Sequence, residues 1–275
     1  MPPAGGPEAL SSGPGPRLPE VLSALARVAL MNALQYRASF FVDFFVGSGN
    51  VVAILLPLAV VFGKTDSVAG WTWDQSLLVT GFFLMMSAVM GGLVEPNLGA
   101  VVEGIRQGQM DYILLKPVDA QLVASAQRVA PAKLWDGLSA LVVIAWGLHG
   151  TGWPGFGPIT AAFCLMIAGV MAMYSLWLLV ICLSFWFVRV DNLRYLLGAV
   201  ADAGRWPVDI YSGVARVFLT VVVPVALASS WPAMALLGRL DLALVVQAIA
   251  VSLGGFAFAR WSWKRALASY TSASS

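Results

Sequence analysis

Six apolar segments long enough to cross a lipid bilayer constrain the fold of this chain more than any other feature. A helix that crosses ~30 Å of hydrocarbon needs about 20 mostly apolar residues. Only 11% of the 275 residues are charged, too few to cover the surface of a soluble protein. We therefore predict an all-α integral membrane protein with six transmembrane helices. These lie at 40–62, 76–94, 132–149, 159–187, 214–230 and 242–259.

The distribution of Lys and Arg predicts how these helices are oriented, because cytoplasmic loops near membrane segments collect basic residues. With both termini in the cytoplasm, 14 of the 16 basic residues fall on the cytoplasmic side. That group includes Arg205 and Arg216, which follow the fourth segment, and only Lys64 and Arg239 remain outside. The sequence thus predicts cytoplasmic termini and an even number of spans. The third and fifth segments are the weakest, since they contain Asp136 and Pro224.

The residues before the first span divide into two parts. Residues 1–17 are rich in Pro, Gly and Ser and are predicted to be a disordered tail. In the following stretch Val21, Leu25 and Val28 recur at helical spacing, which predicts an amphipathic helix on the cytoplasmic surface. A simple extension of the first span is the alternative. The predicted permease domain then covers 18–266, and 267–275 form a cytoplasmic tail.

A Gly63-Lys64-Thr65 sequence resembles the end of a phosphate-binding loop, but its context excludes that function. Such a loop needs Gly five residues before the Gly-Lys pair, and position 58 is Leu. The motif also falls at the predicted outer end of the first span. His149 is the only histidine, so neither a metal site nor His-based catalysis is predicted. The net charge of +2 argues against nucleic-acid binding. We predict a protein that is not an enzyme.

The predicted cytoplasmic loop at 95–119 contains a short amphipathic helix. Leu98, Val101, Val102 and Ile105 follow the i, i+3, i+4, i+7 spacing of one apolar stripe. Gly108 is suited to end that helix. The loop ends in Pro117-Val118-Asp119, and Pro207-Val208-Asp209 occurs before the fifth segment. Both fit helix starts, either independently or as an internal repeat.

Several stretches resemble the six-span permease subunits of type-2 ATP-binding-cassette (ABC) exporters. They are "QYRASFFVDFF", "GQMDYILLKPVD" and "RWPVDIY…VVVPVALASSWPAMALLG", and the resemblance covers about residues 25–262. Its most specific parts are the Gly108, Asp111, Leu114, Pro117 element and the series Pro207, Pro224, Pro232. The most similar branch is poorly characterised and often comprises paired permeases served by one ATPase.

The resemblance implies partners, cofactors and a role for the 97–108 helix. Two permeases, identical or homologous, would form a dimer in the bacterial plasma membrane, with two ATP-binding subunits that hold ATP and Mg²⁺. No cofactor is expected in this chain. The helix at 97–108 would be the coupling helix, shifted by ATPase closure so that the second and third spans tilt. The expected coupling residues are Leu98, Val101, Val102, Ile105, Arg106, Asp111, Leu114 and Pro117.

Two polar residues lie deep within predicted spans. Asn50 and Gln247 either line a translocation pathway or hydrogen-bond between helices. The apolar, aromatic spans favour an amphiphilic drug, lipid or peptide as substrate. A stand-alone channel or secondary transporter, or a membrane-embedded lipid enzyme, is the alternative. The first should show inverted repeats, broken helices or deep charges, and the sequence shows none of them convincingly. The second should show a catalytic constellation.

Overall fold

The computed structural model describes residues 37–108, 110–111, 115, 119–126, 128–185 and 191–269. Side chains are not described at 37–41, 43, 106, 126, 191, 192 and 194. Within this part of the chain the secondary structure is helical, with one isolated backbone bridge between Val68 and Trp71. The predicted tail at 1–17, the predicted helix at 18–36, Leu114 and Pro117 lie outside the described residues.

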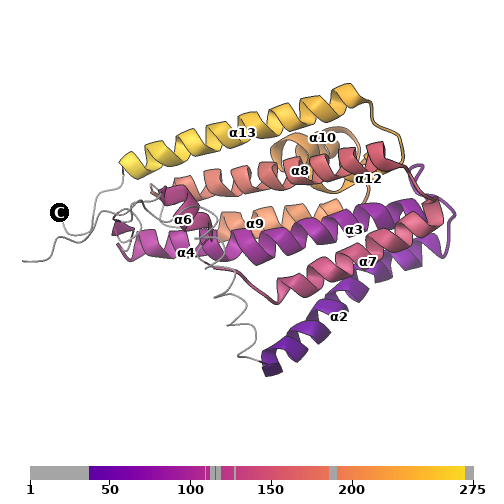
Figure 1. Cartoon of the computed structure of the whole chain (residues 1–275), viewed down its shortest axis with the longest axis horizontal. Coiled ribbons are helices and arrows are strands. Elements are labelled where there is room, and N and C mark those ends of the chain that lie inside the picture. Colours follow the sequence, from indigo (N-terminus) through magenta and orange to yellow (C-terminus); the bar gives the residue numbers. More distant parts are fainter. Residues whose placement is uncertain are drawn as a thin grey trace, which may run out of the picture.

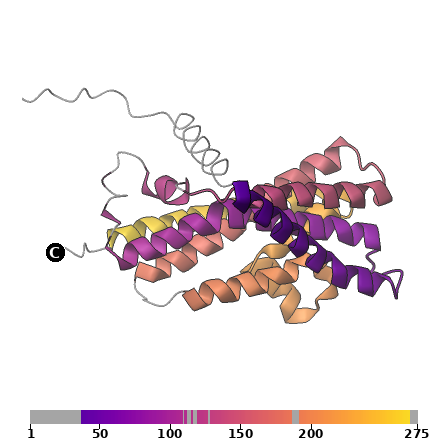
Figure 2. The ribbon, with the colours of Figure 1, turned by 90° about the horizontal axis from the view of Figure 1, so that it is seen from below.

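The long helices run side by side between two ends of an elongated bundle (Figures 1 and 2). One end holds Trp71 and the other holds the helix α6, and we call them the Trp71 end and the α6 end. The long helices are α2 (Arg37–Phe62), α3 (Trp73–Val89), α7 (Lys133–Thr151), α8 (Phe156–Cys182) and α13 (Leu242–Ala268). The shorter α4 (Glu95–Arg106), α6 (Ala120–Ala126) and α9 (Asp191–Ala201) lie at or near the α6 end (Figure 1).

Four described helices are long and apolar enough to cross a membrane. They are Phe44–Phe62, Trp73–Ile105, Phe156–Phe185 and Leu242–Ala268. They correspond to the first, second, fourth and sixth predicted spans. The third prediction corresponds to α7, which is 19 residues long but is not in this set. It packs closely along α3, where Gly81 lies under Ile144 and Gly147 under Leu78.

The second span continues beyond its predicted end at Val94. The π-helical segment η1 (Met90–Val94) joins α3 to α4, so that Trp73–Ile105 is one helical rod. Pro96 has no N–H to donate to the Gly92 carbonyl, and the backbone N–H of Ala130 donates there instead, at 2.8 Å. The predicted 97–108 helix is thus present as α4, and it is continuous with the second span.

The fifth predicted span is replaced by a bent pair of helical segments. The first comprises α10 (Gly213–Val217) and η5 (Phe218–Val222), and the second α11 (Val225–Ala228) and α12 (Ser230–Leu236). They meet at Val223–Pro224 with a bend of 67°. The second segment is packed into the bundle, since a Cβ on Gly169 of α8 would lie 2.4 Å from the Ala228 Cα.

Both ends of the bent pair lie at the Trp71 end. The Trp71 indole N–H donates to Asp209 at 3.0 Å, and Asp209 forms a 2.7 Å ion pair with Arg216. The Arg239 guanidinium carbon lies 4.7 Å from the centre of the Trp71 ring. The prediction that Arg216 and Arg239 lie on opposite sides of the membrane is therefore wrong, and so is a straight span at 214–230. The pair enters and leaves at the same end.

The chain returns from the α6 end to the Trp71 end through α9 and two 3₁₀ segments, η3 (Asp202–Arg205) and η4 (Val208–Ile210). Apolarity alone did not predict this arrangement, because the apolar segment at 214–230 indicates a span and the charged segment at 188–213 indicates a loop. The second part of the bent pair, α11 and α12, is buried in the protein, whereas the first part, α10 and η5, is apolar but largely exposed. The returning segment carries Asp202 and Arg205 toward a groove described below.

Candidate functional site

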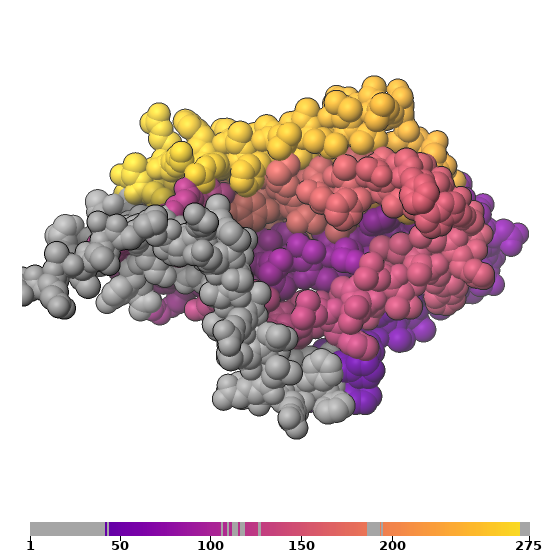
Figure 3. All heavy atoms as spheres, viewed as in Figure 1, coloured from indigo at the N-terminus to yellow at the C-terminus, as the bar shows by residue number. Residues whose placement is uncertain are grey.

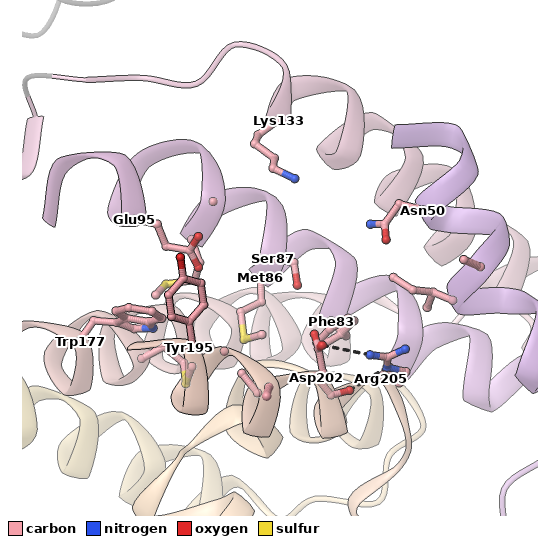
Figure 4. Close-up of a pocket in the computed structure, with 18 residues that line it drawn as sticks. Asn50, Phe83, Met86, Ser87, Glu95, Lys133, Trp177, Tyr195, Asp202 and Arg205 are labelled. Atoms are coloured by element: carbon pink, nitrogen blue, oxygen red, sulfur yellow. Dashed lines mark hydrogen bonds and ion pairs between the residues drawn. The ribbon is translucent and has the colours of Figure 1, made fainter. Parts of the chain in front are cut away.

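A groove of about 660 Å³ lies among α2, α3, η1, α4, α7, α8, α9 and η3 (Figure 4). Its lining is mixed in chemistry, in contrast to the apolar surfaces around it. Polar and charged lining residues are Asn50, Ser87, Glu95, Lys133, Tyr195, Asp202 and Arg205. Apolar lining residues include Phe83, Met86, Met90, Met173 and Trp177.

Asp202 and Arg205 form an ion pair on η3 at the groove wall. Their closest charged atoms are 3.3 Å apart, and the Arg205 Nε donates to the Asp202 carbonyl at 2.8 Å. The Thr80 hydroxyl of α3 donates to the Arg205 carbonyl at 3.1 Å, which fixes η3 against the second span. Thr80 lies seven residues after Trp73, the first residue of α3. The contact between Thr80 and Arg205 is therefore about 10 Å along the helix from the start of α3.

A second ion pair approaches the groove from α7. Lys133 Nζ lies 2.6 Å from Asp136, which is buried. Gly91 and Gly92 make room for the lysine, because a Cβ at either position would come within 3.1 Å of its side chain. Figure 4 shows Lys133 and Asn50 on one side of the groove, opposite Glu95, Trp177 and Tyr195. Because Lys133 pairs with Asp136 and Arg205 pairs with Asp202, these two ion pairs add no net charge to the groove.

Two side chains on the groove, from α9 and from η3, are largely exposed. Tyr195 is 80% exposed, and the Asp202 side chain is 60% exposed. They recur at helical spacing with Gly198 and Ala199, which also line the groove. Sequence reasoning missed Tyr195, Asp202 and Arg205 because it assigned 188–213 to a loop. Their i, i+3/i+4, i+7 spacing was the signal that could have found them.

The predicted coupling stripe on α4 is inside the protein. Leu98, Val101 and Val102 are only 1–2% exposed and belong to the main hydrophobic core, with Ile105 partly buried against it. Glu103 and Gln107, which hydrogen-bond to each other, are exposed instead. The stripe therefore attaches α4 to the rest of the chain. Asp111 is half-buried, and the Arg106 side chain is not described.

Asn97 is a buried residue of α4 that sequence reasoning overlooked. Its amide nitrogen donates to the carbonyls of Leu93 at 2.6 Å and Arg128 at 2.5 Å, and its oxygen accepts from the Arg128 N–H at 2.6 Å. Asn97 thus holds the chain that follows α6 against α4. No sequence pattern pointed to this contact, because the two residues are 31 positions apart.

The structure separates the two predicted pathway residues. Asn50 lines the charged groove. Gln247 lines a second cavity of about 460 Å³ between α8, the bent pair and α13, where most lining residues are apolar. In that cavity the Thr220, Ser175 and Ser252 hydroxyls donate to carbonyls of their own helices. Of the two candidates, only Asn50 is therefore brought together with the charged residues.

The two Pro-Val-Asp sequences have different roles. The Asp119 carboxylate accepts from the backbone N–H groups of Gln121 and Leu122, as a residue at a helix start does. Asp209 instead binds Trp71 and Arg216. Among the described residues no group of three or more His, Cys, Asp or Glu could hold a metal ion.

Apolar helices of membrane-spanning length around a groove that holds two ion pairs indicate an integral membrane protein of the transporter class. A family model described as ABC-2 family transporter protein matches residues 49–274, so the chain belongs to the ABC-2 transporter family. No curated protein and no solved structure matches it. The resemblance to type-2 ABC permeases is confirmed, and the chain is the membrane component of a transporter family that works with ABC ATP-binding subunits.

Proposed function

We propose that this chain is the permease subunit of an ABC exporter and supplies half of a translocation pathway. The observation that carries the proposal is the groove, where charged and aromatic side chains meet at depth in an otherwise apolar bundle. In this proposal the chain crosses the membrane six times, with both termini in the cytoplasm of a bacterial cell. The segment of α9, η3 and η4 is the fifth crossing.

A second permease, identical or homologous, covers the open side of the groove. The exposed Asp202 and Tyr195 side chains support this step. An Asp at the centre of a membrane helix costs about 2.5–3.5 kcal/mol when it must insert among lipids. Pairing two copies across α9 encloses both grooves in one water-accessible cavity and removes that cost.

The groove favours an amphiphilic substrate such as a drug, lipid or peptide. Its two ion pairs, Lys133–Asp136 and Asp202–Arg205, neutralise themselves, so they give little attraction for a small, highly charged ion. The Met86, Met90 and Met173 thioethers and the aromatic rings offer adaptable apolar surface. A neutral or zwitterionic molecule with a large apolar part suits such a lining.

The energy comes from separate ATPase subunits, two per complex, which bind ATP and Mg²⁺. The exposed Glu103 on α4 and Gln107 just after its end form part of the surface that they engage. Because α3, η1 and α4 are one rod, displacement of α4 tilts the second span and its groove wall directly. The buried stripe of Leu98, Val101 and Val102 carries that displacement into the bundle. The open and the closed ATPase dimer are the two states that position α4 differently.

The decisive experiment uses Gly198→Trp in the native complex, purified through a tag on this chain and reconstituted in proteoliposomes. Gly198 lines the groove, and nothing lies within 4 Å of a Cβ built there, so the indole is accommodated but narrows the pathway. We expect ATP-dependent efflux of a fluorescent amphiphile to fall at least tenfold while basal ATP hydrolysis persists. Gly157→Trp, equally free of contacts but away from the groove, is the matched control.

Two results would contradict the proposal. One is unchanged efflux by Gly198→Trp. The other is efflux driven by an ion gradient without any ATPase subunit, which would indicate a secondary transporter.

A further inference from the structure

A polar cluster at the α6 end joins three helices that are far apart in the sequence. Arg260 of α13 donates to both carboxylate oxygens of Asp119, at 3.2 and 2.6 Å. The same guanidinium donates to the Gln121 side-chain oxygen at 2.9 Å. Two-point contact of this kind fixes the direction of the arginine as well as its distance. The start of α6 is thereby bound to α13.

The cluster continues from α6 to α8. The Gln121 amide nitrogen donates to the Tyr174 hydroxyl at 3.0 Å, and the Ser125 hydroxyl lies 2.7 Å from the same atom. Gln121 is buried, and the Tyr174 ring packs 6.1 Å from that of Phe256 on α13. The Asp119–Arg260 ion pair is partly exposed, and the buried Gln121 connects it to Tyr174. A connected polar network of this type favours one arrangement of the elements that it joins. We call Asp119, Gln121, Tyr174 and Arg260 the clasp.

The two ends of α6 are attached to different helices. Its beginning is held to α13 through Asp119, and the chain just beyond its end is held to α4 through Asn97 and Arg128. A seven-residue helix fixed at both ends in this way acts as a short rigid link. Movement of α4 must therefore displace α6, and movement of α6 must act on Arg260.

α13 lies at the periphery of the bundle and packs mainly along α8. Only 22% of its most apolar stretch is buried, against 72% for the rod of α3 and α4. Figure 3 shows α13 along one long edge of the molecule, beside α8. A helix at the periphery with little burial is easily repositioned by an attachment at one end.

We propose that the clasp transmits displacement of α4 and α6 to α13, so that Arg260 and Asp119 are positioning residues for the transport cycle. The proposal rests on the proposed function only in naming ATPase closure as the source of that displacement. Transmission itself is a property of this chain and is measurable without any ATPase.

The test is hydrogen exchange, measured by mass spectrometry on the full-length chain in lipid nanodiscs. Asn97→Ala loosens α6 from its α4 side. With the clasp intact, we expect about fivefold faster exchange both in α6 and in residues 256–268 of α13. In the Arg260→Gln background the same Asn97→Ala change should affect α6 alone. Arg265→Gln removes a charge from the same helix outside the clasp, and it should leave transmission intact.

The proposal fails if Asn97→Ala alters α13 equally in both backgrounds, or does not alter it with the clasp intact. Where Asn97→Ala does not fold, Asn97→Asp loses the donated hydrogen bonds but keeps the acceptor, and the same comparison applies.

A second measurement separates the clasp from the proposed function. In the purified complex, trapping with ATP and vanadate should change exchange in α13 for the native chain and not for Arg260→Gln. An equal response in both overturns the clasp. Absence of any co-purifying ATPase contradicts the proposed function, and the nanodisc comparison then decides the clasp by itself.

Discussion

The indole N–H of Trp71 donates to the Asp209 carboxylate at 3.0 Å, joining residues 138 positions apart. Trp71 is 1% exposed, and Arg239 stacks on its ring while donating to Gln75 at 2.8 Å. Asp209 precedes the bent pair and Arg239 follows it. One tryptophan therefore fixes both ends of a re-entrant segment, and it does so beside the loop between the first two spans.

Replacing Trp71 by Phe should destabilise this end of the molecule. The change removes the hydrogen bond to a charged acceptor, and a bond of that kind contributes about 1.5–3 kcal/mol. We expect a lower midpoint of thermal unfolding in detergent and more proteolysis between 205 and 240. Trp153→Phe is the control, because Trp153 is exposed at the same end. Equal unfolding midpoints for the two variants would contradict the role of Trp71.

Gly169→Leu should prevent the bent pair from packing. The Cβ alone would lie 2.4–2.6 Å from backbone and side-chain atoms of Ala228, which have nowhere to move within the core. Overpacking typically costs 1–3 kcal/mol, and backbone clashes cost more. We expect loss of the monodisperse peak in size-exclusion chromatography. Gly254→Leu, where nothing lies within 4 Å of the added Cβ, should elute like the native chain.

The stability contributed by the clasp should depend on pH. The Arg260 guanidinium, hydrogen-bonded to Asp119, lowers the pKa of that carboxyl below its ordinary value of 3.8. A depressed pKa means that the contribution is fully present above 3.8 and is lost as the pH falls through the lower folded value. The difference in unfolding midpoint between the native chain and Asp119→Asn should therefore be constant near neutrality. It should shrink below pH 3.8. A difference that grows on acidification would contradict the assignment.

The sequence predicted the long helices well because their lengths are set by the thickness of the bilayer. The segment at 40–62 corresponds closely to α2, and the segment at 242–259 begins where α13 begins, although α13 continues to Ala268. The predicted amphipathic helix at 97–108 also exists as α4. Its apolar stripe indicated correctly that one face is covered, but periodicity does not identify what covers it. The core of the same chain covers Leu98 and Val101.

The bent pair and the groove could not be predicted in the same way. Apolar length at 214–230 does not distinguish a span from a segment that enters and leaves at one end, although Pro224 marks the break. The segment at 188–213 was assigned to a loop because of its charges. Asp202 and Arg205 were therefore not considered as ionisable residues within a membrane span. Asn50 was found because it interrupts a clearly apolar helix. Asn97 and Asp119 depend on partners brought close only by the tertiary fold.

The arrangement around Trp71 predicts which residues share one side of the membrane. Single cysteines at Lys64, Arg216 and Arg239, all exposed positions, should react with a membrane-impermeant maleimide from the same side of sealed vesicles. A cysteine at Gln107, exposed near the α6 end, should react only from the other side. The native Cys164 and Cys182 are first replaced by Ala. In right-side-out vesicles we expect the first three variants to be labelled and Gln107→Cys to be protected until the membrane is permeabilised. If Arg216→Cys were instead labelled from the same side as Gln107→Cys, Arg216 and Arg239 would lie on opposite sides of the membrane. That result would support a straight span at 214–230 and exclude the re-entrant pair.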